Sequence, residues 1–175
     1  MKRNFRRQEG FTLIEILVVV ILLGILATII IPQISVSTED AKLNTLKTNL
    51  NHLRSAVELY YYQHNNTYPG ATKHTDGAAV GSDAEAEAAF IPQLTQYTSL
   101  TGEVATSGDS TYQFGPYIKS ATLPTNPFNN AADIVCDYDE TNITARDSTG
   151  ASAGYKFYPQ TGILISGDNG QHNDL

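Results

Sequence analysis

The longest apolar stretch of the chain lies near its amino terminus, from Phe11 to Ile31. Its 21 residues include one ionisable side chain, that of Glu15. A helix rises 1.5 Å per residue, so this segment would be about 30 Å long, which matches the hydrocarbon core of a bilayer. The pattern therefore predicts one membrane-spanning helix over residues 11–32, with Pro32 just beyond the apolar run.

An amphipathic pattern follows this apolar segment. Apolar residues recur at spacings of three and four, at Leu43, Leu46, Leu50, Leu53, Val57 and Tyr60. This spacing predicts that the helix extends through residues 33–66 and stops at the breakers of 65–70. We expect the apolar stripe to pack on the chain's own globular part, because two heptads are short for the alternative, a coiled coil. His52 and His64 are expected to be solvated.

The remaining residues, 67–175, predict a small globular domain. Ser82 and Glu85 have the spacing of a capping box, which predicts a short helix near 83–91 that ends around Pro92. Residues 93–100 are a candidate for another helical turn or two. Short β runs follow at 134–138, 154–158 and 163–166, and the last two are joined by a turn as in a hairpin. The predicted fold class is α+β, with the long amino-terminal helix packed on a small antiparallel sheet.

Charge is distributed unevenly along the chain. Residues 1–10 carry four basic residues against Glu9, a net charge of +3, while residues 11–175 carry 7 basic and 17 acidic residues, a net charge of −10. Basic residues before a membrane span stay on the cytoplasmic side, so the globular domain is expected outside the cytoplasm. An acidic domain is a poor partner for nucleic acid, and we expect no nucleic-acid binding.

The small residue Gly10 separates the basic leader from the apolar helix. An ordinary secretory signal has an apolar region of about 7–15 residues with its cleavage site after that region. Here the apolar run is longer, and no such site follows it. Cleavage after Gly10 would remove the leader and retain the helix.

Glu15 is a carboxylate inside the apolar span. A charge inside a membrane span costs on the order of 3 kcal/mol or more, so such a residue is a candidate functional site. After cleavage behind Gly10, the new α-amino group of Phe11 lies one helical turn away. In a neighbouring copy staggered by one step, this ammonium could pair with Glu15. The alternative is that Glu15 reaches the membrane interface near the helix end.

The string from Gly10 to Glu15, Gly-Phe-Thr-Leu-Ile-Glu, closely resembles the prepilin motif of type IV pilins and type II secretion pseudopilins. The resemblance implies a pilin-like fold. It also implies that a membrane peptidase cuts after Gly10 and N-methylates Phe11, and that Glu15 guides subunit registration. In this family a proline kinks the helix, a role that carries over to Pro32.

A second resemblance involves the carboxy-terminal half. The segments GPYIKSATLPTNPFNN and GYKFYPQTGILISGDNG are similar to the end of the major pseudopilin of type II secretion, and the chain lacks the paired cysteines of many type IV pilins. Major pseudopilins hold Ca²⁺ in a loop near the end of the sheet. This resemblance implies Asp168, Asn169 and Asp174 as calcium ligands. The alternative is a frayed polar terminus.

These resemblances imply a structural function rather than an enzymatic one. We expect a single-pass protein of the bacterial inner membrane with its globular domain in the periplasm, in which residues 1–10 are the leader. Its expected partners are further copies in a helical filament, the prepilin peptidase, the secretion assembly platform and minor pseudopilins. The alternative is a type IV pilus subunit for adhesion, motility or DNA uptake. We expect no enzyme, because no nucleophile elbow, metal motif or triad stands out.

Overall fold

The structure, a computed structural model, describes residues 10–175, apart from the side chains of residues 29–37. It contains one long helix, α1 (Leu13–Gln63), whose residues divide between two compact units, Met1–Ala41 and Lys42–Leu175. No helix within the described residues is long and apolar enough to be assigned as a membrane span. The backbone at Pro32 is helical. The side chain of Pro32 is not described, so the kink predicted at this proline stays a prediction.

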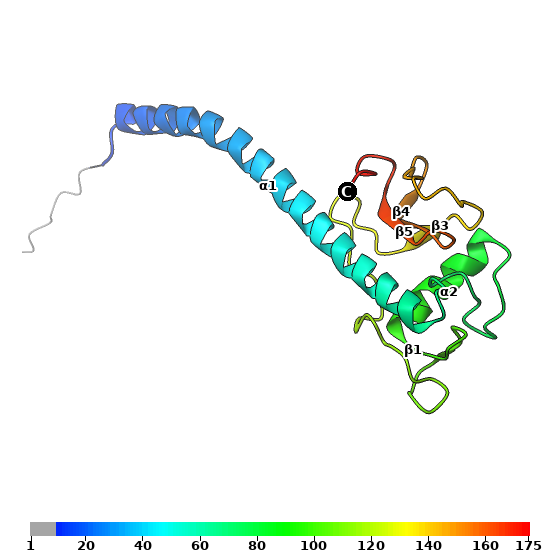
Figure 1. Ribbon diagram of the computed structural model, residues 1–175. Helices are drawn as coiled ribbons and strands as arrows, with labels where there is room; N and C mark the ends of the chain where they lie inside the picture. The colour runs from blue at the N-terminus through cyan, green and yellow to red at the C-terminus, as the bar shows by residue number, and fades with distance from the viewer. Residues whose placement is uncertain (1–9) are drawn as a thin grey trace, which may run out of the picture. The chain divides into compact units, whose positions relative to one another are not determined.

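The second unit is built on the amphipathic part of α1. Its apolar stripe faces the core, which confirms the prediction that the stripe packs on the chain's own domain: Leu46, Leu50, Leu53, Val57 and Tyr60 are each at most 1% exposed. They pack with residues of the second helix and of the sheet, such as Phe90 and Phe157. Figure 1 shows this part of α1 alongside α2 and the strands β3, β4 and β5.

The second helix, α2 (Asp83–Thr95), begins where the capping box predicted, with the Ser82 hydroxyl accepting a hydrogen bond from the Glu85 backbone N–H at 3.4 Å. The helix was predicted to end around Pro92, with residues 93–100 as a candidate for another turn or two, and it continues to Thr95 with Pro92 inside it. Burial of Phe90, Gln93 and Leu94 on one face stabilises the last turn and compensates for the N–H that proline lacks.

The main sheet has three strands in the order β3 (Ile134–Cys136), β4 (Ser152–Tyr158) and β5 (Ile163–Asp168). The predicted hairpin is confirmed, since β4 and β5 pair antiparallel. The predicted α+β class is confirmed, and the sheet differs from the predicted small antiparallel one in that β3 runs parallel to β4. This pairing is possible because the 15 residues between β3 and β4 form a long connection, as parallel neighbours require.

A two-stranded antiparallel sheet, β1 (Tyr97–Thr98) with β2 (Val104–Ala105), lies in the region after α2 where the sequence predicted no strand. The buried amide of Gln93 connects this region to the loop after α1. It accepts a hydrogen bond from the Gly70 N–H at 2.7 Å and donates to the carbonyl oxygens of Thr72 and Gly102.

The segment 115–130 connects α1, α2 and the sheet. The Tyr117 hydroxyl donates to Gln63 of α1 at 2.7 Å. Asn126 is fully buried and donates to the Gly154 carbonyl and the Ser166 hydroxyl, both at 2.9 Å. The segment that carries the second resemblance is therefore a structural connection within the globular unit.

His64 does not lie where the sequence predicted. Its side chain is 1% exposed, so the expectation that it is solvated is wrong, whereas His52 is exposed as expected. The His64 ring stacks on Tyr60 at 3.7 Å, with Nδ1 2.8 Å from the Tyr60 carbonyl and Nε2 3.0 Å from the Thr98 hydroxyl. Burial lowers the pKa of His64, and the Tyr60 carbonyl partly offsets this effect.

This lowered pKa makes the stability of the globular unit pH-dependent. The unfolded His64 binds its proton near pH 6.5, above the folded pKa, so the free energy of unfolding falls as the pH drops below about 6.5. The loss reaches at most about 1.4 kcal/mol per pH unit until the folded pKa is passed. Thermal unfolding between pH 5 and 8 measures this loss; it should disappear in His64→Gln and persist in the exposed control His52→Gln.

Candidate functional site

The residues around the predicted cleavage site are accessible and lie outside regular structure. Gly10 and Phe11 precede the first residue of α1, and Phe11 is 87% exposed. A side chain built on Gly10 would meet no atom within 4 Å. The Gly10–Phe11 peptide bond is therefore open to a peptidase, which needs an extended and exposed substrate.

The Glu15 side chain takes part in capping the amino-terminal end of α1. Its Oε2 atom accepts hydrogen bonds from the Thr12 backbone N–H and the Thr12 hydroxyl, each at 2.7 Å. The Thr12 hydroxyl in turn accepts from the Glu15 backbone N–H at 3.3 Å. This is a reciprocal capping box, and it satisfies backbone donors that the helix start leaves free.

Sequence reasoning missed the capping role of Thr12. The signal was present, because Thr-Leu-Ile-Glu at 12–15 has the spacing of a capping box ahead of an apolar run. The predicted role of Glu15 was based on its charge inside the apolar span and on the resemblance to the prepilin motif. In the uncleaved chain the Phe11 nitrogen is a neutral amide, and within the described residues Glu15 forms no ion pair.

The helix that follows this cap exposes its apolar side chains on all sides. From Leu13 to Leu26 the large apolar residues are between 49% and 89% exposed. An exposed apolar surface of this extent is stable only when lipid or other protein covers it. The described part of the first unit therefore contains an exposed apolar helix with the charged residue Glu15 in its first turn.

The carboxy-terminal loop holds the three predicted calcium ligands in different surroundings. Asp168 is 7% exposed; its Oδ2 contacts Nδ1 of His172, and its buried Oδ1 has no hydrogen-bond partner in the described part of the chain. The Asn169 side-chain oxygen accepts from the Gly150 N–H at 2.7 Å. Asp174 lines a pocket that also contains Arg54.

The described residues contain no group of three or more His, Cys, Asp or Glu side chains placed to hold a metal ion. Of the three predicted ligands, Asp168 fits a cation by the chemistry of its unpartnered carboxylate oxygen. Ca²⁺ takes six to eight oxygens, and backbone and amide oxygens can supply several of them. Asn169 has the right donor type, but its oxygen is already engaged with Gly150.

The similarity of this chain to known proteins includes the Gly10–Glu15 motif. Residues 5–31 match the family model described as the prokaryotic N-terminal methylation motif. The chain is 44% identical over 55 residues to type II secretion system core protein G of Pseudomonas aeruginosa, covering 31% of this chain and 39% of that protein. It is 32% identical over 88 residues to core protein G of Klebsiella pneumoniae, covering 50% of this chain and 62% of that protein.

A longer but weaker match is to core protein G of Escherichia coli K12, 27% identical over 124 residues, which covers 71% of this chain and 69% of that protein. The chain thus spans less than two thirds of the length of the Pseudomonas and Klebsiella proteins. No solved structure matches. The resemblance to type II secretion pseudopilins that the sequence predicted is confirmed as a similarity.

Proposed function

We propose that this chain is a structural pseudopilin subunit, processed after Gly10 and assembled into a periplasmic filament for type II protein secretion. The observation that carries the proposal is the Gly10–Glu15 motif at the start of an exposed apolar helix, inside the segment that matches the methylation-motif family. Names of the similar proteins support a secretion filament over the alternative, a type IV pilus subunit.

Assembly would give the apolar helix the cover that the isolated chain lacks. Before assembly, lipid of the inner membrane would surround residues 11–32, with the basic leader on the cytoplasmic side and the globular unit in the periplasm. In the filament, the helices of neighbouring copies would replace the lipid. The prepilin peptidase, the assembly platform and minor pseudopilins would act on the chain in turn.

Glu15 would select the correct register between copies. An unpaired carboxylate among apolar helices is costly, whereas one that meets the Phe11 ammonium of a neighbour is compensated. Arrangements that leave either charge unpaired are thereby disfavoured, which gives specificity as well as attraction. N-methylation would keep the positive charge of the Phe11 nitrogen.

Processing is tested by Gly10→Val. A branched side chain at the cleavage site should block removal of the leader, and the chain should keep residues 1–10 in intact-mass spectrometry from cells that contain the secretion system. Gly24→Val is the matched control, because Gly24 also has open space around it. The proposal fails if Gly10→Val is cleaved at the same bond as the wild type, or if the wild type keeps its leader.

We also propose that Ca²⁺ binds in the loop after β5. The unpartnered Oδ1 of Asp168 supports this proposal. Asp168, Asn169 and Asp174 would supply oxygen ligands, and the bound ion would tie the carboxy-terminal loop to the sheet, which stabilises the folded state by mass action.

The calcium proposal predicts that a chelator lowers the melting temperature of the full chain by several degrees and that added Ca²⁺ restores it. Asp168→Ala should melt lower and lose this response, whereas the exposed control Asp139→Ala should keep it. An identical melting temperature with chelator and with excess Ca²⁺ would contradict calcium binding.

A further inference from the structure

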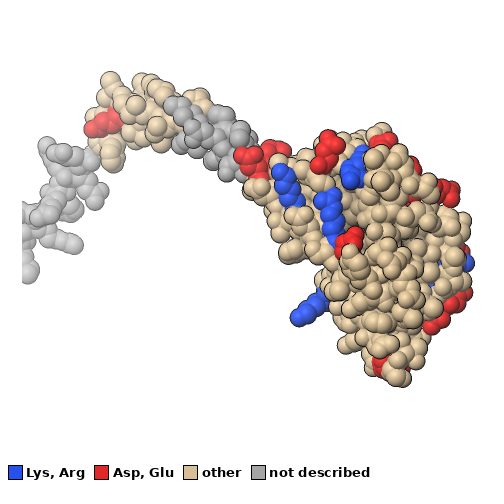
Figure 2. Space-filling model, viewed as in Figure 1, with Lys and Arg blue, Asp and Glu red and all other residues tan. Residues whose placement is uncertain are grey.

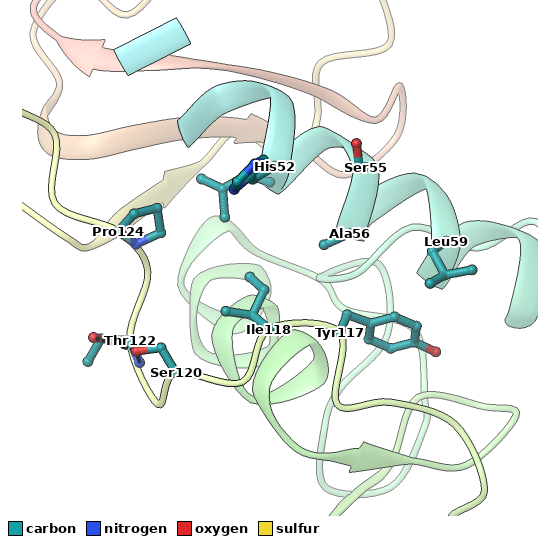
Figure 3. Close-up of a pocket in the computed structure, with 10 residues that line it drawn as sticks. His52, Ser55, Ala56, Leu59, Tyr117, Ile118, Ser120, Thr122 and Pro124 are labelled. Carbon is teal, nitrogen blue, oxygen red and sulfur yellow. Dashed lines mark hydrogen bonds between the residues drawn. The ribbon is translucent and has the colours of Figure 1, made fainter. Parts of the chain in front are cut away.

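A groove runs along the surface of the globular unit between α1 and the segment 117–124, with a volume of about 520 Å³. Figure 3 shows the side chains that line it, with Ala56 and Leu59 of α1 across from Ile118 and Tyr117 of the opposite segment. Leu59 is 50% exposed at this groove. The core stripe of α1 does not fill it, so an apolar surface remains uncovered beside the helix.

Among the residues that the structure describes, no Asp, Glu, Lys or Arg lines this groove. Its polar members are His52, Tyr117 and three hydroxyl residues, Ser55, Ser120 and Thr122. Another large pocket of this unit differs, because Arg54, Glu58, Arg146 and Asp174 line it. Figure 2 shows acidic and basic side chains scattered over the visible face of the unit, with uncharged surface between them.

The net charge of the chain indicates which kind of protein surface can bind in this groove. Residues 11–175 carry a net charge of −10, so two copies repel each other over most of their surfaces. Contact through an uncharged surface avoids both this repulsion and the cost of desolvating charged groups. Centres of protein interfaces are likewise depleted in charge and rich in aromatic residues, and Tyr62, 74% exposed, follows Leu59 on α1 by three residues.

We propose that this groove is the site at which the globular unit binds a second copy of the chain. The proposal rests on the proposed function, because a filament places copies side by side. A helical filament uses head-to-tail contacts, so the groove of one copy receives a different surface of the next. The contact adds a second point of attachment to the one at the amino-terminal helix.

The test compares two substitutions that add the same charge. Leu59→Glu places a carboxylate in the groove, and Leu100→Glu places one at a residue of similar exposure, 46%, that does not line the groove. In cells with the secretion system, we expect Leu59→Glu to reduce the number of filaments at least about tenfold and Leu100→Glu to leave it unchanged. Leader cleavage and steady-state amount of each variant report folding.

A photo-crosslinking amino acid at position 59 keeps a large apolar side chain there and avoids a folding defect. Illumination of assembled filaments should yield dimers of this chain from position 59 and none from position 100. Wild-type assembly by Leu59→Glu, or crosslinks from position 59 only to another protein, would overturn the inference. Failure of the wild-type chain itself to assemble would instead contradict the proposed function.

Discussion

Glu15→Ala is expected to be inserted and cleaved like the wild type and to form almost no filaments. The substitution removes the carboxylate and leaves the Phe11 ammonium without a partner among apolar helices. Breaking such a buried pair costs about 3–5 kcal/mol, and about 1.4 kcal/mol corresponds to a tenfold change in an equilibrium. Filament yield should therefore fall at least about a hundredfold, measured by shearing filaments from cells and quantifying the subunit.

Glu39→Ala is the matched control, because Glu39 is an exposed carboxylate of the same helix outside the motif. It should assemble normally. Normal filaments from Glu15→Ala, or equal losses from the two variants, would contradict a role of Glu15 in registration. Loss of cleavage in Glu15→Ala would place its role at the peptidase instead.

The Thr12–Glu15 capping box bears on the proposed pairing of Glu15 with the Phe11 ammonium of a neighbouring copy. In the uncleaved chain the Glu15 carboxylate already accepts two hydrogen bonds from Thr12. An ammonium from a neighbouring copy adds a charged partner, and such charge-assisted hydrogen bonds are roughly twice as strong as neutral ones. Thr12 thus holds the carboxylate near the helix start, where the neighbour's amino group would meet it.

Asn126→Asp is expected to destabilise the globular unit by at least about 3 kcal/mol at neutral pH, because it replaces a fully buried neutral amide with a charged carboxylate. The Asn126 amide nitrogen donates to the Gly154 carbonyl and the Ser166 hydroxyl. A carboxylate of the same shape would place a negative oxygen against that carbonyl. Chemical denaturation measures the free energy of unfolding.

Asn142→Asp is the control for this prediction. Asn142 is exposed, and its side-chain oxygen accepts from Thr144, a role that aspartate can also fill. Its free energy of unfolding should change by less than about 0.5 kcal/mol. A similar stability of Asn126→Asp and the wild type would show that segment 115–130 does not depend on this amide.

Local patterns in the sequence predicted the parts of the fold that depend on neighbouring residues. The stripe from Leu46 to Tyr60 follows the helical period, and the β4–β5 hairpin follows from two β runs around a short turn. The capping box at Ser82 also placed the start of α2 correctly. Each of these signals lies within a few residues of the structure that it specifies.

The features that were missed depend on contacts between distant residues. The parallel pairing of Ile134 with Tyr155 spans a connection that no local pattern identifies. The buried His64 ring depends on Thr98, 34 residues away, whose hydroxyl lies 3.0 Å from Nε2. Pro92 normally ends a helix, and its place inside α2 accompanies the burial of Phe90, Gln93 and Leu94 in the core.

At the candidate site, the motif predicted candidate residues but not their geometry. Gly10, Phe11 and Glu15 were identified from residue type and spacing, whereas the Thr12–Glu15 hydrogen bonds became visible only in the structure. The calcium ligands were assigned by resemblance, and of these Asp168 alone shows an unpartnered buried oxygen among the described residues. A loop assembled from separate segments cannot be derived from local spacing.

A helical reconstruction of filaments assembled from the processed chain tests the central claim most directly. It should show Phe11 as the first residue, with its nitrogen within ion-pair distance of the Glu15 carboxylate of a neighbouring copy. A filament in which Glu15 contacts only its own Thr12, or in which residues 1–10 are still attached, would contradict the account.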